Sequence, residues 1–250
     1  MGNIFTVIFY QPILNLLVFL YDTVSFQDLG IAIILLTIVI KLILWPLGQK
    51  SIKSQKALQD LQPKIEELKK QYGTDKVALS QATMNLYKES KINPLSSCFP
   101  LLIQLPFLFA VYQVFRDGLN NKLDLVYSFI YKPQLINSLS LGFLDLSKPN
   151  IYLAVFAGVA QFVQAKMMMT KQPVIKTEGS KDESMTAIMN KQMLYFMPAI
   201  TIFIGISLPG GLTLYWCVIT LLTALQQFVV FRGHNKKNDI TKTIEGEIIK

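Results

Sequence analysis

The stretch LLTIVIKLILWPLG, residues 35–48, places a single lysine, Lys41, inside an apolar run that is otherwise suited to a membrane span. A lysine at the centre of such a helix costs roughly 2.5–3.5 kcal/mol on insertion scales. The flexible side chain can lower this cost by reaching toward the membrane interface, so a purely structural interpretation stays open beside a functional one. Polar residues in the other apolar runs would favour the functional interpretation.

Apolar runs of similar length recur along the chain and predict five membrane-spanning helices. Hydrophobic residues make up 52% of the 250 residues, and roughly 20 apolar residues cross a bilayer. The predicted spans are residues 29–47, 95–115, 151–169, 193–208 and 212–231. The sequence therefore predicts an all-α, polytopic membrane protein built on a five-transmembrane-helix bundle, with a core at 29–232.

The N-terminal segment, residues 1–28, has a different character. Its apolar run at 4–20 is interrupted by Gln11 and Pro12, which favours an N-terminal interfacial helix, and a sixth span is the alternative. The segment shows neither a basic n-region nor a clear small-residue cleavage site, so we expect no signal peptide.

The distribution of basic residues predicts the orientation. The segment 48–93 carries nine lysines, 116–150 carries four basic residues, 166–192 carries five, and the chain from Arg232 onward carries five. By the positive-inside rule, the N-terminus lies outside and the C-terminus in the cytoplasm. Segments 48–93 and 166–192 are then cytoplasmic, 116–150 is an outer loop, and 233–250 is a basic cytoplasmic tail.

The first cytoplasmic segment has a helical pattern. Apolar residues alternate at steps of three and four from Leu58 to Tyr72, which is typical of an amphipathic helix, and Pro63 either starts or kinks this helix. A turn signal follows at 73–75, and Leu79 and Leu86 indicate a second helix. Residues 54–92 are therefore predicted to form a cytoplasmic helical hairpin.

Several predicted spans carry polar residues on one face. Thr37, Lys41 and Trp45 lie four residues apart, and further spans contribute Gln104, Gln164 and Trp216. Polar faces turn inward because lipid cannot satisfy their hydrogen bonds. Together with a charge, these faces predict a wet cavity.

Residues that the spans lack exclude several functions. No Asp or Glu falls in the five predicted spans, which excludes an intramembrane ion pair with Lys41 and argues against a carboxylate proton relay. The single histidine, His234, lies in the tail, so a Ser/His pair within the spans is excluded. No Gly-rich phosphate loop occurs, and nothing indicates a metal site or a cofactor. We therefore expect no enzymatic activity.

Four motifs, in matching order, resemble the YidC/Oxa1/Alb3 family of membrane protein insertases. They are IKLILWPL at 40–47, NPLSSCFPLLIQLPFLFAVYQVF at 93–115, FAGVAQFVQAKMMM at 156–169 and LPGGLTLYW at 208–216. The resemblance covers about residues 10–232 and is to the compact five-span form.

The resemblance implies a hydrophilic groove in the inner leaflet, open to cytoplasm and lipid and closed on the outside. Lys41 stands where the family usually has an arginine, which removes the planar fork for bidentate carboxylate binding but keeps a long-range attraction. Gln104 and Trp216 match groove positions, and Gln164 is a looser match. With Thr37 from the face of Lys41, the predicted substrate groove is Lys41, Thr37, Gln104, Gln164 and Trp216.

The implied function is insertion of nascent membrane proteins into the bilayer of a bacterial plasma membrane. The implied partners are nascent membrane proteins, membrane lipid, the ribosome through the hairpin and basic tail, and the Sec translocon, with no sequence-specific nucleic acid. Two alternatives stay open. One is an assembly chaperone that acts after insertion by a Sec channel, and the other is an anion or solute transporter with Lys41 as its anion site.

Overall fold

A computed structural model of the protein describes residues 4–73, 75–93, 99–117, 119, 123–168 and 192–248, with the backbone alone at 99–101 and 233–248. Long helices dominate these residues, which confirms the all-α prediction. In the described part of the chain, the only strands are β1 (Leu139–Ser140) and β2 (Leu144–Asp145), an antiparallel pair in which Leu139 lies opposite Asp145. The predicted loop 166–192 lies mostly outside the described residues.

Apolar helices coincide with all five predicted spans. Three are long and apolar enough to cross a membrane, in α2 (Leu29–Asp60), α6 (Ile151–Met168) and α9 (Gly210–Ile248). Two shorter ones are α5 (Phe99–Arg116) and the pair η4 (Gln192–Phe196) and α8 (Met197–Gly205). The chain is therefore a multi-pass membrane protein.

The N-terminal helix is also long enough and apolar enough to cross a membrane. It combines η1 (Thr6–Tyr10) and α1 (Gln11–Thr23), and Pro12 lies in its interior near the start of α1. The sixth-span alternative requires such a helix, and the interfacial placement stays a prediction.

The helix α2 continues well past the predicted end of the first span. It contains Pro46 and runs to Asp60, because the polar residues after Gly48 are helix-compatible and no stop signal follows them. The next helix, α3 (Gln62–Tyr72), carries Pro63 in its first turn, where the missing N–H leaves no hydrogen bond unmade. Pro63 therefore starts a helix, which was one of the two predicted roles.

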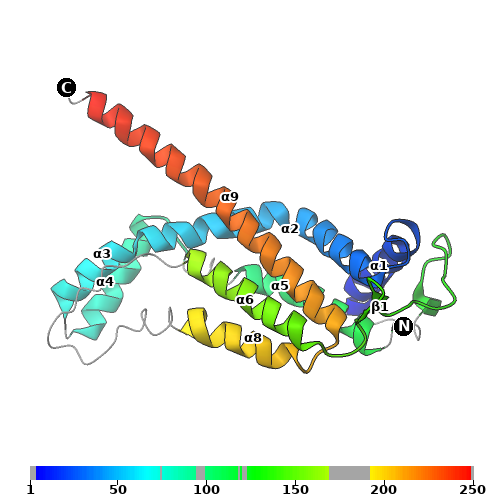
Figure 1. The fold of residues 1–250 in the computed structure, drawn as a ribbon. Helices are drawn as coiled ribbons and strands as arrows, with labels where there is room; N and C mark the ends of the chain where they lie inside the picture. The colour runs from blue at the N-terminus through cyan, green and yellow to red at the C-terminus, as the bar shows by residue number, and fades with distance from the viewer. Residues whose placement is uncertain are drawn as a thin grey trace.

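The predicted hairpin is present as α3 and α4 (Lys76–Glu89), which pack against each other. Gly73 ends α3 with a positive φ of 44°, a conformation that favours glycine. Asp75 then caps α4, since its carboxylate accepts hydrogen bonds from the N–H groups of Val77 and Ala78. Figure 1 shows this pair at one end of the bundle, opposite the end that carries β1.

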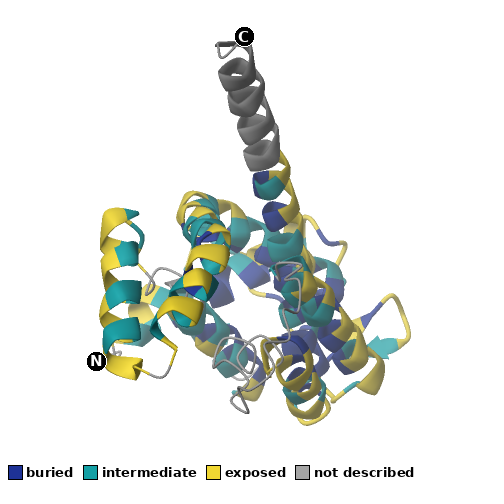
Figure 2. Cartoon of the chain, turned by 90° about the vertical axis from the view of Figure 1, so that its left-hand side faces the viewer, coloured by how far each residue is buried: buried dark blue, intermediate teal, exposed yellow. Residues whose placement is uncertain are grey.

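The main hydrophobic core lies between α1, α2, α5 and the start of α9. We call the end of the bundle with residues 123–150 the loop end, and the end with α3 and α4 the hairpin end. Leu14, Leu36, Val111 and Tyr215 are almost completely buried in this core, near the loop end. Further packing joins α9 to α2 and α6, and α6 to α8. Figure 2 shows buried residues where the helices face one another and exposed residues on the outward faces.

Hydrogen bonds join the loop end to α1 and to the start of α2. Asn15 accepts a hydrogen bond from the Tyr127 N–H at 2.7 Å and donates to the Leu125 carbonyl at 3.2 Å. Asp28 caps α2 through the Ile31 N–H and also accepts from the Leu141 N–H at 2.6 Å.

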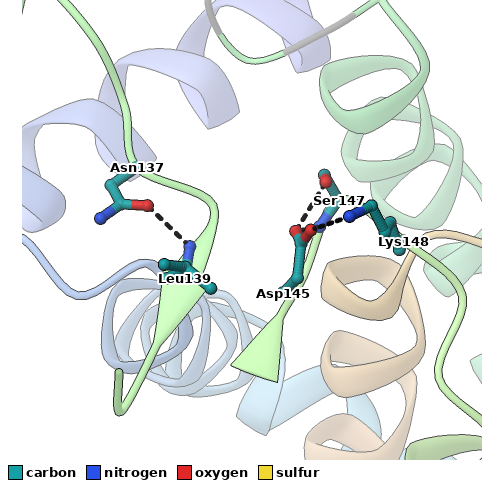
Figure 3. A network of polar contacts seen from close by, with 5 residues as sticks. All are labelled: Asn137, Leu139, Asp145, Ser147 and Lys148. Carbon is teal, nitrogen blue, oxygen red and sulfur yellow. Dashed lines mark hydrogen bonds and ion pairs between the residues drawn. The ribbon is translucent and has the colours of Figure 1, made fainter. Parts of the chain in front are cut away.

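The loop also has internal polar contacts (Figure 3). Asp145 accepts hydrogen bonds from Ser147 and pairs with Lys148, and together these contacts hold the pKa of Asp145 well below its usual value. The loop end is therefore an ordered part of the fold.

Candidate functional site

Lys41 makes a hydrogen bond across the bundle. Its Nζ donates a hydrogen bond of 2.8 Å to the Thr223 hydroxyl of α9. Thr223 in turn donates its own proton to the Ile219 carbonyl, one turn back on α9, at 2.6 Å. Lys41 is half-buried, so the charge lies at the contact between α2 and α9 and keeps some exposure.

No carboxylate pairs with Lys41 among the residues that the structure describes. The ion pairs found there join Lys56 to Asp60, Arg116 to Asp117 and Lys148 to Asp145. The ammonium is held by a neutral oxygen.

A second contact ties α2 to α9 one turn further along. The Gln226 side-chain N–H donates to the Trp45 carbonyl at 3.0 Å, and Gln226 is fully buried. Gly48 makes room for this amide, because a Cβ at position 48 would lie 3.0 Å from the Gln226 Oε1. Thr223 and Gln226 are three residues apart, so both face α2.

Thr37 is completely buried, one helical turn before Lys41. Its hydroxyl donates to the Ile33 carbonyl of the same helix at 2.6 Å. Thr37 therefore lies on the same helical face as Lys41, as predicted from spacing. Its hydroxyl proton is donated within α2 and does not reach Lys41.

Gln104 of α5 contacts α9, and Trp216 is a residue of α9. The Gln104 amide donates a short hydrogen bond to the hydroxyl of Tyr215, which is completely buried. Trp216 is half-buried and precedes Thr223 by seven residues, which places it on the same side of α9 and about 10.5 Å away along the axis. The helix α9 thus links Lys41 of α2 with Gln104 of α5.

Gln164 lies on α6, which packs along α9, and it is half-buried. Its neighbour Gln161 accepts a short hydrogen bond from Thr201 of α8. The contacts around Lys41 thus involve α2 and α9, and Gln164 stands apart from them on a third helix.

Four short stretches at about the level of Lys41 are less buried than the parts of the same helices nearer the loop end. No fully buried residue occurs in four stretches of the described chain: 41–50 of α2, 102–109 of α5, 161–168 of α6 and 221–225 of α9. Closer to the loop end, the same four helices bury Leu36, Val111, Ala157 and Tyr215. Lys41, Gln104 and Gln164 lie in these stretches, and toward the hairpin end α2 and α9 are buried again at Ile52, Gln226 and Gln227.

The sequence analysis names Trp216 on this helix but does not identify Thr223. The available signal was its spacing, since Thr223 follows Trp216 by seven residues and therefore lies on the same face of its helix. What could not be predicted is the register between α2 and α9, which decides that Thr223 meets Lys41.

Comparison with known proteins identifies the family. The sequence model of the 60Kd inner membrane protein family matches residues 19–238. The chain is 38% identical over 223 residues to the membrane protein insertase YidC of Syntrophus aciditrophicus, with 88% of this chain and 36% of that protein covered. Identity to the insertase YidC of Fusobacterium nucleatum is 35% over 227 residues, with 89% and 97% covered.

A third relative, the insertase YidC of Haemophilus influenzae, is 34% identical over 227 residues, which is 91% of this chain and 37% of that protein. The chain thus spans little more than a third of the Syntrophus and Haemophilus proteins and corresponds to nearly the whole Fusobacterium protein. With the matching motifs in order and the apolar helices in place, the chain belongs to the YidC/Oxa1/Alb3 family of inner-membrane proteins.

Proposed function

We propose that the protein inserts nascent membrane proteins into the bilayer of a bacterial plasma membrane. The observation that carries this proposal is Lys41, a cation inside α2 whose defined partner is the neutral Thr223 hydroxyl. A membrane helix retains such a charge when it has a role, because the charge disfavours insertion of the helix itself. The family relatives named as insertases supply the class of substrate.

The four less buried stretches support a polar groove lined by α2, α5, α6 and α9. Its stretches 41–50, 102–109, 161–168 and 221–225 contain no fully buried residue among the described side chains, whereas the loop end is packed and fastened. In such a groove, Lys41, Gln104, Gln164 and Trp216 contact the substrate, and Thr37 supports the helical face that carries Lys41.

In the proposed mechanism, Lys41 attracts the acidic, hydrophilic tail of a client. Opposite charges at about 4 Å attract by about 4 kcal/mol at an effective dielectric constant of about 20. Polar side chains replace part of the water that the tail loses on entry. The apolar segment of the client then moves into lipid, and its hydrophobic transfer drives the step without covalent chemistry or a cofactor.

The proposed orientation places the N-terminus outside and the hairpin and tail in the cytoplasm. The end of α2, from which the hairpin begins, contacts two other helices. Gln59 donates a hydrogen bond to the Met168 carbonyl at the end of α6, and Lys56 lies over the Phe231 ring of α9. The hairpin and the basic tail bind the ribosome, and the Sec translocon and membrane lipid are further partners.

Reconstitution tests this function. The purified protein is placed in liposomes that hold no other protein, and a single-span client with an acidic tail is synthesised beside them. We expect the tail to become protected from protease only in liposomes that contain the protein. Equal protection in empty liposomes, or none in either, contradicts insertase activity.

A further inference from the structure

The hydrogen bond between Lys41 and Thr223 has a fixed direction. A threonine hydroxyl carries one proton and two lone pairs. Thr223 donates its proton to the Ile219 carbonyl at 2.6 Å, so toward the Lys41 ammonium at 2.8 Å it serves as an acceptor. The hydroxyl is therefore oriented to receive a cation.

The position of Thr223 relative to Lys41 is set by the neighbouring contact. Gln226 donates to the Trp45 carbonyl and fills the space above Gly48, which holds the register of α9 along α2. Trp45 follows Lys41 by four residues and Gln226 follows Thr223 by three, so the two contacts lie one turn apart on the same pair of helices.

A neutral partner has a different consequence from a carboxylate. A carboxylate at Thr223 would cancel the charge of Lys41 and compete with an acidic client for it. A hydroxyl holds the ammonium in place and leaves its charge intact, and a hydrogen bond to a neutral oxygen is weaker than one to a carboxylate. The carboxylate of a client can therefore replace Thr223 as the hydrogen-bond partner of the Lys41 ammonium.

We propose that Thr223 is the positioning residue for Lys41: it holds the ammonium at the contact of α2 with α9 while the site is empty and yields it to the carboxylate of a client. The preference of the protein for acidic over neutral client tails then depends on Thr223 as well as on Lys41. This inference rests on the proposed insertase function.

Three substitutions at position 223 separate the roles of shape, hydroxyl and charge. Thr223→Val keeps the shape and loses the acceptor, Thr223→Ser keeps the acceptor, and Thr223→Asp adds a charge that pairs with Lys41. Thr23→Val is the matched control, since Thr23 also donates to the carbonyl four residues back at 2.6 Å and lies on α1, away from Lys41. Each variant is reconstituted as the full chain.

The first readout is insertion of two clients that differ only in an acidic or a neutral tail. We expect Thr223→Val to lower acidic-tail insertion about tenfold, as for loss of one hydrogen bond to a charged group. Insertion of the neutral client should stay unchanged, and Thr223→Ser should restore the preference. Thr223→Asp should abolish the preference to the same extent as Lys41→Ala. A general packing defect would lower insertion of both clients alike and would contradict the inference.

The second readout does not depend on insertion. Reductive methylation of the reconstituted protein, with Lys41 quantified by mass spectrometry, reports how firmly the amine is held. Methylation of Lys41 should rise several-fold in Thr223→Val and stay at the parent level in Thr223→Ser and Thr23→Val. Equal methylation in all variants overturns the role of Thr223.

The two readouts separate this inference from the proposed function. If Lys41→Ala removes the preference for acidic tails while Thr223→Val leaves both the preference and the methylation unchanged, the inference is wrong and the function stands. If Lys41→Ala leaves the preference intact, the electrostatic part of the proposed function is wrong, and the inference falls with it.

Discussion

Lys41 is the residue on which the functional account depends. Its position inside an apolar run was visible in the sequence, as was the absence of acids in the predicted spans. Its partner was not predictable, because the spacing of threonines along α9 leaves open which of them meets α2. The contacts of Thr37 and Gln104 show the same limit: spacing predicted their helical faces but neither the Ile33 carbonyl nor the Tyr215 hydroxyl.

Replacement of Lys41 tests the charge. Lys41→Ala should reduce insertion of acidic-tailed clients about tenfold or more, since one charge-assisted contact is lost, and should leave neutral-tailed clients near the parent level. Lys41→Arg should retain activity because the charge remains. Insertion is measured by protease protection, with the amount of folded protein in the membrane as the control. Equal insertion of acidic-tailed clients by Lys41→Ala and the parent would contradict the electrostatic role.

At the scale of the elements, the apolar pattern predicted the spans but not how far the helices continue beyond them. The first span was predicted to end at residue 47, yet α2 runs through Pro46 and Gly48 to Asp60. Apolar composition marks the part of a helix that lies in lipid, whereas backbone hydrogen bonds continue the helix into polar sequence. The contacts of Asn15 and Asp28 with the loop end were also not predicted, because they join residues more than 100 positions apart.

Asp28 should stabilise the loop end. Partial burial acts to raise its pKa, but hydrogen bonds from Leu141, Ile31 and Ser140 outweigh that effect and hold the pKa below its usual value. Asp28→Ala should therefore lower the free energy of unfolding by about 1–2 kcal/mol, through the lost helix cap and loop contacts. Thermal unfolding in detergent measures this, with Asp22→Ala as the control for loss of one carboxylate. A decrease in the free energy of unfolding no larger than that of the control would contradict the stabilising role of Asp28.

The lowered pKa of Asp28 predicts how the stability of the protein depends on pH. Because the folded pKa lies below the unfolded value of about 3.9, the stabilisation by ionised Asp28 is fully present above the unfolded value. It is lost as the pH falls through the folded pKa. The difference in stability between the parent and Asp28→Asn should therefore shrink at pH values below about 4. A difference that grows toward low pH would contradict the sign of the shift.

The contact between α6 and α8 depends on a small residue. A Cβ at Gly158 would meet the Ile202 side chain and lie 3.1 Å from the Pro198 carbonyl. Gly158→Leu should destabilise the protein by about 1–3 kcal/mol through overpacking. Val159→Leu is the matched control, because Val159 is 53% exposed on the same helix. Thermal unfolding that shows equal melting temperatures for the two variants would contradict this packing.

At the scale of the whole molecule, orientation follows from the distribution of lysines rather than from the fold. Cysteines introduced near Gly73 and near Glu178, in a background without Cys98 and Cys217, should be protected from an impermeant thiol reagent in intact cells. Permeabilised cells, where both positions should react, are the control. Labelling of the hairpin cysteine in intact cells would invert the proposed orientation.

The central claim is that a client passes beside Lys41, along the less buried stretches of α2, α5, α6 and α9. A photo-crosslinker placed at Gln104 or at Trp216, during insertion of an acidic-tailed client into liposomes, tests it most directly. Phe156 and Phe203, which are 66% and 71% exposed on α6 and α8, serve as outward-facing controls. We expect strong client adducts at Gln104 and Trp216 and weak adducts at the two controls. The strong adducts should be lost when Lys41→Ala is combined with the probe. Equal adducts at all four positions would mean that no defined path exists and that Lys41 is a snorkelling lysine.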